Sequence, residues 1–365
     1  MPDKGYARPR KRLKSHHTKQ ESLDHPPIVV ALSAETMSEY HRSSNLGAYL
    51  AQIGRLADEL LDPNRDVVFF LGAGACLSGK QAGLPSGADL AKKLIAKCNV
   101  DWNQEVPLST AAFYYESLMG RPALNRFLCD QIKIGVSPSP TIERLVELLA
   151  MIESRNEVPP LVITTNYDTK FEEAYKKRFE REPQVIVYNG ACDPNSSTEP
   201  LHVGLGKYAK MPADWVWRLK HTVLFKMHGC ISHANGASRT LVATEEDYIN
   251  FLANAISERP EKRIMNFVTS QIKMNTVVFI GYSLADWNFR VIYKATAETN
   301  HDHEAFAVRF KDIESRKENA LEAAAWNNLV EFWNRKGVHI INADGAEFMN
   351  DLLEAARRLR NANGV

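Results

Sequence analysis

The sequence predicts an α/β fold, built as a doubly wound parallel sheet with helices on both faces and a helical insertion subdomain. Two observations predict it. Short apolar runs alternate with helical patterns along most of the chain. These runs are continuously apolar, which is typical of strands covered on both faces. At 365 residues the chain has room for one large domain or two ordinary ones.

The strands are expected where β-branched, aromatic and aliphatic residues follow one another without interruption. The first of them, Asp66 to Leu71, comes shortly after the turn at Pro63 and Asn64. The predicted strands cover 66–71, 161–164, 185–187, 222–225, 276–280, 305–308 and 338–341.

Helices are expected between the strands, where apolar residues recur at spacings of three and four. In the first helix Leu46, Leu50 and Ile53 follow this spacing. The predicted helices include 38–61, 88–98, 141–154, 169–179, 245–256, 287–297 and 314–333. Two stretches break the alternation. About 101–158 contains helical patterns only and is predicted to be the helical insertion, and about 189–220, rich in Pro, Gly and Asn, is predicted to be a long loop near the site.

Composition excludes several classes of protein. Hydrophobic residues make up 44% and charged residues 24%, so a collagenous, wholly disordered or disulfide-scaffold protein is excluded. The net charge of +1 gives no general case for nucleic-acid binding. The five cysteines form no C-x-x-C pair, which fits a reducing compartment, and no apolar run is long enough to span a membrane. We expect a soluble, cytoplasmic protein without membrane contact.

The first 27 residues differ from the rest of the chain. Seven of them are Lys or Arg, three are acidic and few are apolar, so the segment cannot bury enough surface to fold and is predicted to be a disordered basic tail. Its core, Arg8 to Lys14, could contact nucleic acid or an acidic partner. A solvated tail without a partner is the alternative.

A glycine-containing turn follows the first predicted strand. Gly72, Ala73 and Gly74 could let backbone amides approach a pyrophosphate, because glycine has no Cβ to hold the phosphate away. The full dinucleotide fingerprint would place a third glycine at Leu77 and an acidic residue after the next strand, and both are missing. A nucleotide loop and a tight structural turn therefore stay equally open. A second turn contains Pro85.

Two later strands end in polar residues at the edge where open α/β sheets bind their ligands. After the strand 161–164 comes Asn166, whose amide could hold a water or a ribose hydroxyl, and then Asp168, which could equally cap the next helix. After the strand 222–225 comes His228, which is either a core histidine or a general base.

A third strand, 276–280, ends in the same way. It leads into Gly281, Ser283 and Asp286. Glycine and serine allow close approach to a phosphate or ribose, and the aspartate could cap a helix or hold a hydroxyl.

The order of these motifs resembles the sirtuin superfamily over roughly residues 40 to 360. The motifs are Gly72-Ala73-Gly74, Gly83-Leu84-Pro85, Thr165-Asn166-Tyr167-Asp168, His228-Gly229 and Gly281-Tyr282-Ser283-Leu284. The residues of these motifs are most similar to those of the sirtuin-like NAD-cleaving effectors of prokaryotic antiphage defence. Two positions depart from the superfamily, with Cys76 in place of its serine and Ser86 in place of its aspartate.

The resemblance implies that residues 28–365 form one Rossmann-like NAD-binding catalytic domain. NAD would be the substrate, with Asn166 orienting a water or the nicotinamide ribose and His228 acting as general base. The residues implied to hold the dinucleotide are Gly72, Ala73, Gly74, Pro85, Thr165, Asp168, Gly281, Ser283, Leu284 and Asp286. No metal is expected, because the two C-x-x-C pairs of the deacylase zinc site are missing.

The implied activity is hydrolysis of the nicotinamide–ribose bond of NAD, which would deplete NAD in infected cells as abortive-infection defence. The alternatives are a sensor that binds NAD or ADP-ribose without cleaving it and a deacylase without zinc. Because the chain ends soon after its last helix, we expect its activity to be controlled by assembly with other chains. A homo-oligomer is expected, together with a separate partner chain such as a HerA-type hexameric ATPase or a short Argonaute.

Overall fold

The computed structural model describes most of the chain between Leu46 and Ala362. The described residues are 46–62, 65–77, 84–99, 105–132, 136–153, 159–188, 201–204, 207–210, 220–233, 241–256, 262–282, 293, 304–309 and 320–362. The predicted basic tail and the predicted helix 287–297, apart from Tyr293, lie outside this part.

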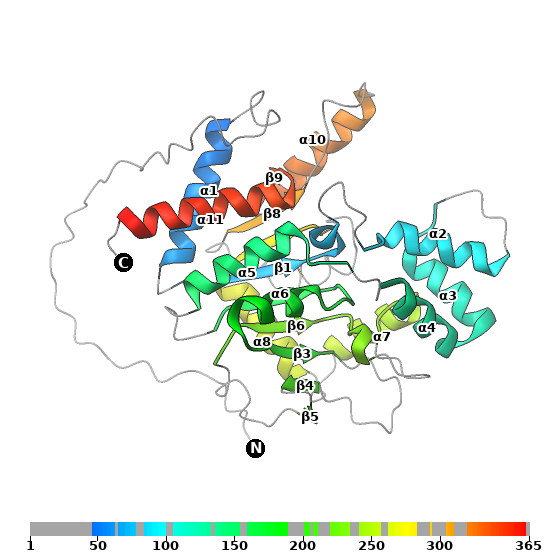
Figure 1. Cartoon of the computed structure of the whole chain (residues 1–365). Coiled ribbons are helices and arrows are strands. Elements are labelled where there is room, and N and C mark those ends of the chain that lie inside the picture. Colours follow the sequence, from blue (N-terminus) through cyan, green and yellow to red (C-terminus); the bar gives the residue numbers. More distant parts are fainter. Residues whose placement is uncertain are drawn as a thin grey trace, which may run out of the picture.

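The centre of the molecule is a sheet of seven parallel strands with the order β3-β6-β2-β1-β7-β8-β9 (Figure 1). Each strand coincides with one of the predicted apolar runs, so the predicted doubly wound parallel sheet is confirmed. The strands are β1 (Val67–Leu71), β2 (Leu161–Thr164), β3 (Gln184–Val187), β6 (Val223–Lys226), β7 (Thr276–Ile280), β8 (Ala305–Arg309) and β9 (Val338–Asn342).

Two further strands extend the sheet beyond β3. They are β4 (Leu201–Gly204), which pairs antiparallel with β3, and β5 (Lys207–Lys210), which pairs antiparallel with β4. The prediction of a loop throughout 189–220 was therefore wrong for these eight residues. Both strands are short and contain glycine or lysine, and β5 forms the edge of the sheet, so neither has the continuous apolar run that marked the parallel strands.

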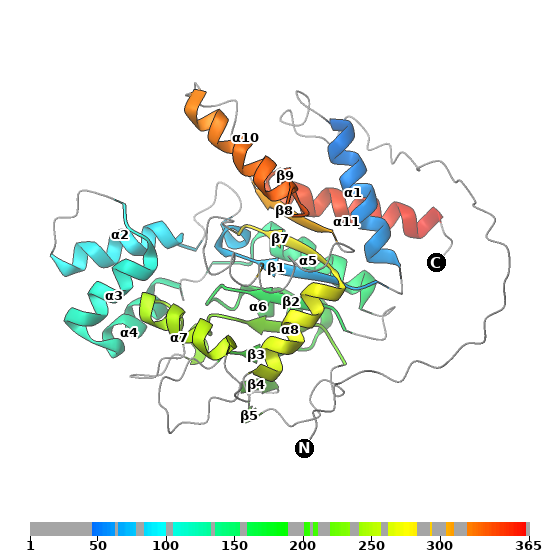
Figure 2. The same cartoon turned by 180° about the vertical axis from the view of Figure 1, so that it is seen from behind.

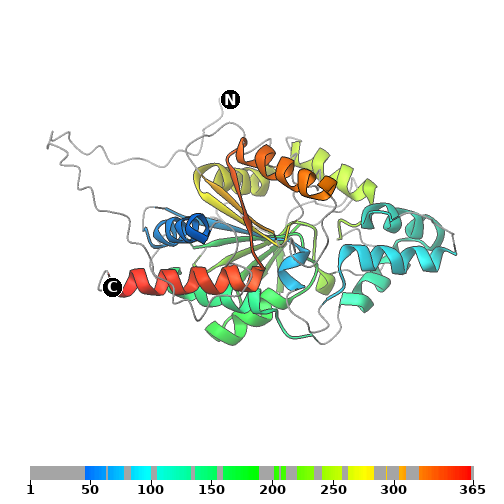
Figure 3. The ribbon, with the colours of Figure 1, turned by 90° about the horizontal axis from the view of Figure 1, so that it is seen from above.

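Helices cover both faces of the sheet, as the view from above shows (Figure 3). Strand β1 is buried on both sides, because Phe69 and Leu71 pack into one core and Val68 and Phe70 into the other. The first core lies under α1 (Leu46–Leu61), α5 (Pro140–Ile152), α6 (Lys170–Phe179) and α11 (Gly345–Ala362). The second lies under α7 (Glu245–Ile256), α8 (Lys262–Met274) and α10 (Ala320–Asn334).

Three helices form a lobe beside the sheet, visible from the front and from behind (Figures 1 and 2). They are α2 (Gly87–Cys98), α3 (Leu108–Met119) and α4 (Arg121–Ile132). The third helix of the stretch 101–158, α5, instead packs on the sheet between α6 and α11. The helical stretch thus contributes to both the lobe and the main body. Among the described helices, none combines the length and apolar character needed to cross a bilayer.

Candidate active site

The four central strands end together at one edge of the sheet, in the order β6-β2-β1-β7. From β1 the chain continues to β2 on one side and later reaches β7 on the other side, so β1 lies at a switch point of the topology. Ligands of open α/β sheets bind in the crevice that such a switch creates at the carboxyl ends of the strands. At this edge lies a cavity of about 410 Å³, within the size range of small-molecule sites.

The glycines after β1 and β7 let two turns pack directly against each other. Gly72 N–H donates to Ile280 O (2.9 Å), and Gly74 N–H donates to Gly281 O (2.8 Å). A Cβ on Gly72 would lie 2.5 Å from Gly281 O, and a Cβ on Gly281 would overlap the Ala75 amide. Gly281 also has a φ of +64°, which disfavours any side chain. The structural-turn interpretation thus holds for Gly72. Ala73, Gly74 and Gly281 also line the cavity.

Asn166 follows β2 and lines the cavity with part of its side chain exposed. Its Nδ2 donates to Gly72 O (3.0 Å) and contacts Cys76 Sγ (3.4 Å). Its backbone amide donates to Thr164 Oγ1 (3.0 Å). The side chain is thereby anchored to the turn after β1, and no described residue donates a hydrogen bond to its Oδ1. This oxygen can accept a hydrogen bond from a ligand or a water.

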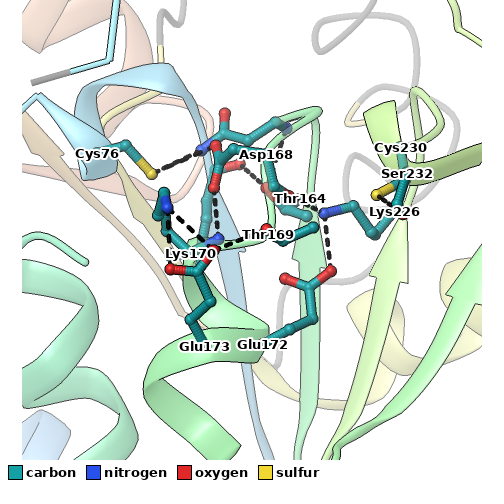
Figure 4. Close-up of polar contacts among 12 residues, drawn as sticks. Cys76, Thr164, Asp168, Thr169, Lys170, Glu172, Glu173, Lys226, Cys230 and Ser232 are labelled. Atoms are coloured by element: carbon teal, nitrogen blue, oxygen red, sulfur yellow. Dashed lines mark hydrogen bonds and ion pairs between the residues drawn. The ribbon is translucent and has the colours of Figure 1, made fainter. Parts of the chain in front are cut away.

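Asp168 lies two residues before the start of α6 (Figure 4). Its Oδ1 accepts from Lys170 N–H (2.9 Å), and its Oδ2 accepts from Cys76 Sγ (3.6 Å). The first contact bears out a role at the helix start, as the sequence allowed. Burial, and then the nearby Asp168 carboxylate, raise the pKa of the Cys76 thiol well above its ordinary value. Cys76 is therefore a protonated hydrogen-bonding group in this site and not a thiolate.

His228 follows β6 and lines the same cavity as Asn166. It is only 4% exposed, and burial lowers its pKa to about 3, so the imidazole is neutral near pH 7. Its ring packs edge-on against Tyr248 (centroids 5.2 Å apart) and Phe251 (6.0 Å), both on α7. Its Nε2 is buried without a hydrogen-bond partner in the described part of the chain. A buried imidazole nitrogen of this kind is a rare feature that calls for an explanation.

The helical lobe supplies an apolar wall of the cavity, which the sequence patterns did not reveal. Apart from the predicted Pro85, Thr165 and Asp168, the lining includes Leu84, Leu90, Leu108, Ile132, Tyr167, Tyr248 and Tyr282. The first four are apolar residues of the lobe or its entry, and their spacing marks a packed helix face without saying what it faces. The predicted ligands Ser283, Leu284 and Asp286 lie outside the described residues. Within the described residues, no group of three or more His, Cys, Asp or Glu side chains could hold a metal ion.

Comparison with known proteins identifies the family. Residues 160–341 match the model of the SIR2-like domain. The chain therefore carries a SIR2-like domain. The matched range contains Asn166 and His228 and begins after the glycine turn that follows β1.

A curated relative and three solved structures are similar to this SIR2-like chain. The relative is named Defense-associated sirtuin 2, from Bacillus subtilis, and is 23% identical over 231 residues. The match covers 63% of this chain and 18% of the relative, so the chain spans about a fifth of that protein's length. A structure described as a basis for the mechanism and regulation of Sir2 enzymes covers 85% of this chain and 98% of its own, with 15% identity and a TM-score of 0.44. Two mutant Sir2 homologues in complex with ADP-ribose each cover 84% of this chain and 97% of their own, with 11% and 13% identity and TM-scores of 0.44 and 0.45.

Proposed function

We propose that this SIR2-like chain is an NAD hydrolase that cleaves the bond between nicotinamide and ribose and releases nicotinamide and ADP-ribose. The observation that carries the proposal is that Asn166 and His228 line one cavity, with His228 Nε2 buried and unpartnered. Leaving such a group without a partner costs about 1–3 kcal/mol, which a ligand hydroxyl would recover on binding. The ribose of NAD carries hydroxyls of this kind.

The reaction depends mainly on the positions of the water and the ribose, because nicotinamide is already a good leaving group. The C1′–N bond breaks with its electron pair going to the positively charged pyridinium ring, so nicotinamide leaves as a neutral molecule. A water oxygen then bonds to C1′ and loses a proton. Asn166 Oδ1 is placed to accept a hydrogen bond from that water, since Nδ2 is already used by Gly72 O. The neutral imidazole of His228 can accept a hydrogen bond from a ribose hydroxyl, which raises the electron density on that oxygen and so stabilises the positive charge that develops on the sugar.

We further propose that cleavage of NAD serves defence against phage by abortive infection, which the name of the Bacillus subtilis relative supports. An unrestrained NAD hydrolase would harm the cell that makes it. We therefore propose control by assembly, either as a homo-oligomer or with a separate partner chain such as a HerA-type ATPase or a short Argonaute. Light scattering, together with specific activity measured over a range of chain concentrations, tests the homo-oligomer.

The proposed function is tested by incubating the purified full chain with NAD and measuring nicotinamide by chromatography. Asn166→Ala and His228→Ala are each expected to lower nicotinamide release by about 10²-fold or more, since each removes a group that acts on the reacting atoms. Asn342→Ala and His339→Ala are the matched controls. They remove the same side-chain types from β9, outside the cavity lining, and should keep turnover.

Circular dichroism of all four variants shows whether the fold is intact. NAD that binds and is recovered unchanged would favour a sensor, if this holds both for the chain by itself and for the chain mixed with the protein encoded by a neighbouring gene. Nicotinamide released only when an acetyl-lysine peptide is present would favour a deacylase. Wild-type turnover in folded Asn166→Ala and His228→Ala would refute the assigned roles.

A further inference from the structure

Lys226 is a buried lysine that the proposed chemistry does not use. It is the last residue of β6, two residues before His228, and its side chain is 1% exposed. A lysine ammonium is rarely buried so completely unless it is paired, because it loses its hydration. Its contacts therefore deserve a specific explanation.

The ammonium of Lys226 joins the end of β6 to the turn before α6 and to α6 itself (Figure 4). It donates a hydrogen bond to the backbone carbonyl oxygen of Asp168 and forms an ion pair with Glu172 Oε1 (3.0 Å) on α6. Burial opposes its charge, but Cys230 and Glu172 outweigh this effect, and the pKa of Lys226 is raised. One side chain of β6 thus holds the turn that leads from β2 into α6.

The connection continues from Asp168 to Asn166. Asp168 Oδ2 accepts from Cys76 Sγ, and Cys76 Sγ is contacted by Asn166 Nδ2 at 3.4 Å. The backbone is fixed as well, because Met227 N–H donates to Thr164 O (2.8 Å). Lys226 is therefore linked to Asn166 through Asp168 and Cys76, and it precedes His228 by two residues at the end of β6.

Resting on the proposed function, we propose that Lys226 is a positioning residue that sets Asn166 relative to His228 by holding the Asp168 carbonyl. Charge balance alone does not require a lysine here, since a buried ion pair can be replaced by uncharged residues with little loss of stability. The carbonyl of Asp168, in contrast, needs a donor from β6. Without that donor the turn can shift, and a displacement of about 1 Å can lower a rate about 10²-fold.

The test compares Glu172→Gln with the double variant Glu172→Gln/Lys226→Met. Both lack the Glu172 charge, and they differ only in the lysine ammonium, so neither leaves an unpaired buried carboxylate. Glu172→Gln is expected to keep kcat for nicotinamide release within about threefold of wild type. The double variant is expected to lose about 10²-fold in kcat, with KM changed by less than about threefold, because NAD still binds but the reacting groups are misplaced.

A second measurement does not depend on turnover. Amide hydrogen exchange, followed by mass spectrometry, should become faster in peptides covering 164–170 and 227–231 of the double variant, and not in Glu172→Gln. The control is Lys170→Met. Lys170 is also largely buried, but it pairs with Glu173 one turn along the same helix (2.9 Å), so its loss should leave kcat and both peptides unchanged.

The outcomes separate the two proposals. Unchanged exchange in both peptides of the double variant, or kcat equal to that of Glu172→Gln, would overturn the role of Lys226. Equal losses in Glu172→Gln and in the double variant would also overturn it, since the ion pair rather than the carbonyl contact would then matter. If the wild-type chain releases no nicotinamide, the proposed function fails, and the exchange comparison alone decides the role of Lys226.

Discussion

The imidazole of His228 is neutral because of where it lies and not because of a charged neighbour. The aromatic rings of Tyr248 and Phe251 pack edge-on against it, and burial alone accounts for the lowering of its pKa to about 3. A neutral imidazole keeps one nitrogen free to accept a hydrogen bond. The same burial makes the fold sensitive to acid, because the unfolded chain can take up a proton that the folded chain excludes.

The free energy of unfolding should therefore decrease as the pH is lowered from the unfolded pKa of His228 towards its folded pKa. Below its unfolded value of 6.5, the unfolded state binds a proton and the native state does not until about pH 3. His228 alone should lower the free energy of unfolding by about 2 kcal/mol between about pH 7 and about pH 5. Replacing it in His228→Gln should remove that part of the slope, measured by urea unfolding at several pH values.

The control for this measurement is His339→Gln, which removes an imidazole from a partly exposed position on β9. This variant shows how much the slope changes when an imidazole outside the cavity is lost. A His228→Gln variant that loses stability on acidification as steeply as the wild type would show that His228 is already protonated in the folded chain.

The residues of the site differ in how well the sequence could locate them. Asn166 and His228 could be found because each follows an apolar strand, and parallel strands bring their carboxyl ends to one edge. Leu90 and Leu108 could not, because an apolar helix position looks the same whether it faces a core or a cavity. The ambiguous glycine turn needed the structure too, since only the contact between Gly72 and Gly281 shows what the missing Cβ makes room for.

At the scale of elements, the helical lobe is fastened to α7, which carries the rings against His228. Arg121 at the start of α4 is 6% exposed and contacts both Asp247 Oδ1 (2.8 Å) and Glu116 Oε2 (2.6 Å). Asp247 also accepts from the amides of Ala243 and Thr244, which precede α7. The guanidinium therefore joins α3 and α4 to the amino-terminal end of α7.

Breaking this junction should destabilise the chain strongly. Arg121→Met leaves the buried carboxylate of Asp247 and the partly buried carboxylate of Glu116 without their cation and should lower the free energy of unfolding by about 3–5 kcal/mol, measured by urea denaturation. The matched control is Arg144→Met, which removes a half-exposed partner of Glu147 (2.8 Å) and should cost less than about 1 kcal/mol. Equal effects of the two substitutions would show that the buried junction adds nothing beyond a surface ion pair.

Helices and strands could be predicted from the sequence where their burial alone determined the pattern of apolar residues. Six of the seven parallel strands, from β3 to β8 in the sheet order, are buried along most of their length, so each is an apolar run. β9 is only partly buried, but it is still mostly apolar. The strands β4 and β5 were not predicted, because the backbone pairing of β4 with β3 and of β5 with β4 needs no apolar pattern. The stretch 101–158 was correctly expected to be helical, but which helix packs on the sheet depends on contacts between distant segments, as with α5 and α11.

At the scale of the whole molecule, charge is divided unevenly along the sequence. Residues 1–27 contain seven basic and three acidic residues, and the whole chain has a net charge of +1, so residues 28–365 carry −3. The described cores begin at Tyr49, and the composition of 1–27 cannot support a core of its own. The basic segment should therefore affect electrostatic binding and have little effect on folding.

Deleting residues 1–27 separates these two effects. The shortened chain should unfold within about 2 °C of the full chain and release nicotinamide at the same rate, because its core and cavity are complete. It should elute from heparin at a lower salt concentration than the full chain, because the net charge changes from +1 to −3. A full-length variant in which the seven basic and three acidic residues of 1–27 are all replaced by Gln also carries −3, so it controls for length and should elute like the deletion. A large loss of thermal stability on deletion would show instead that the segment packs against the fold.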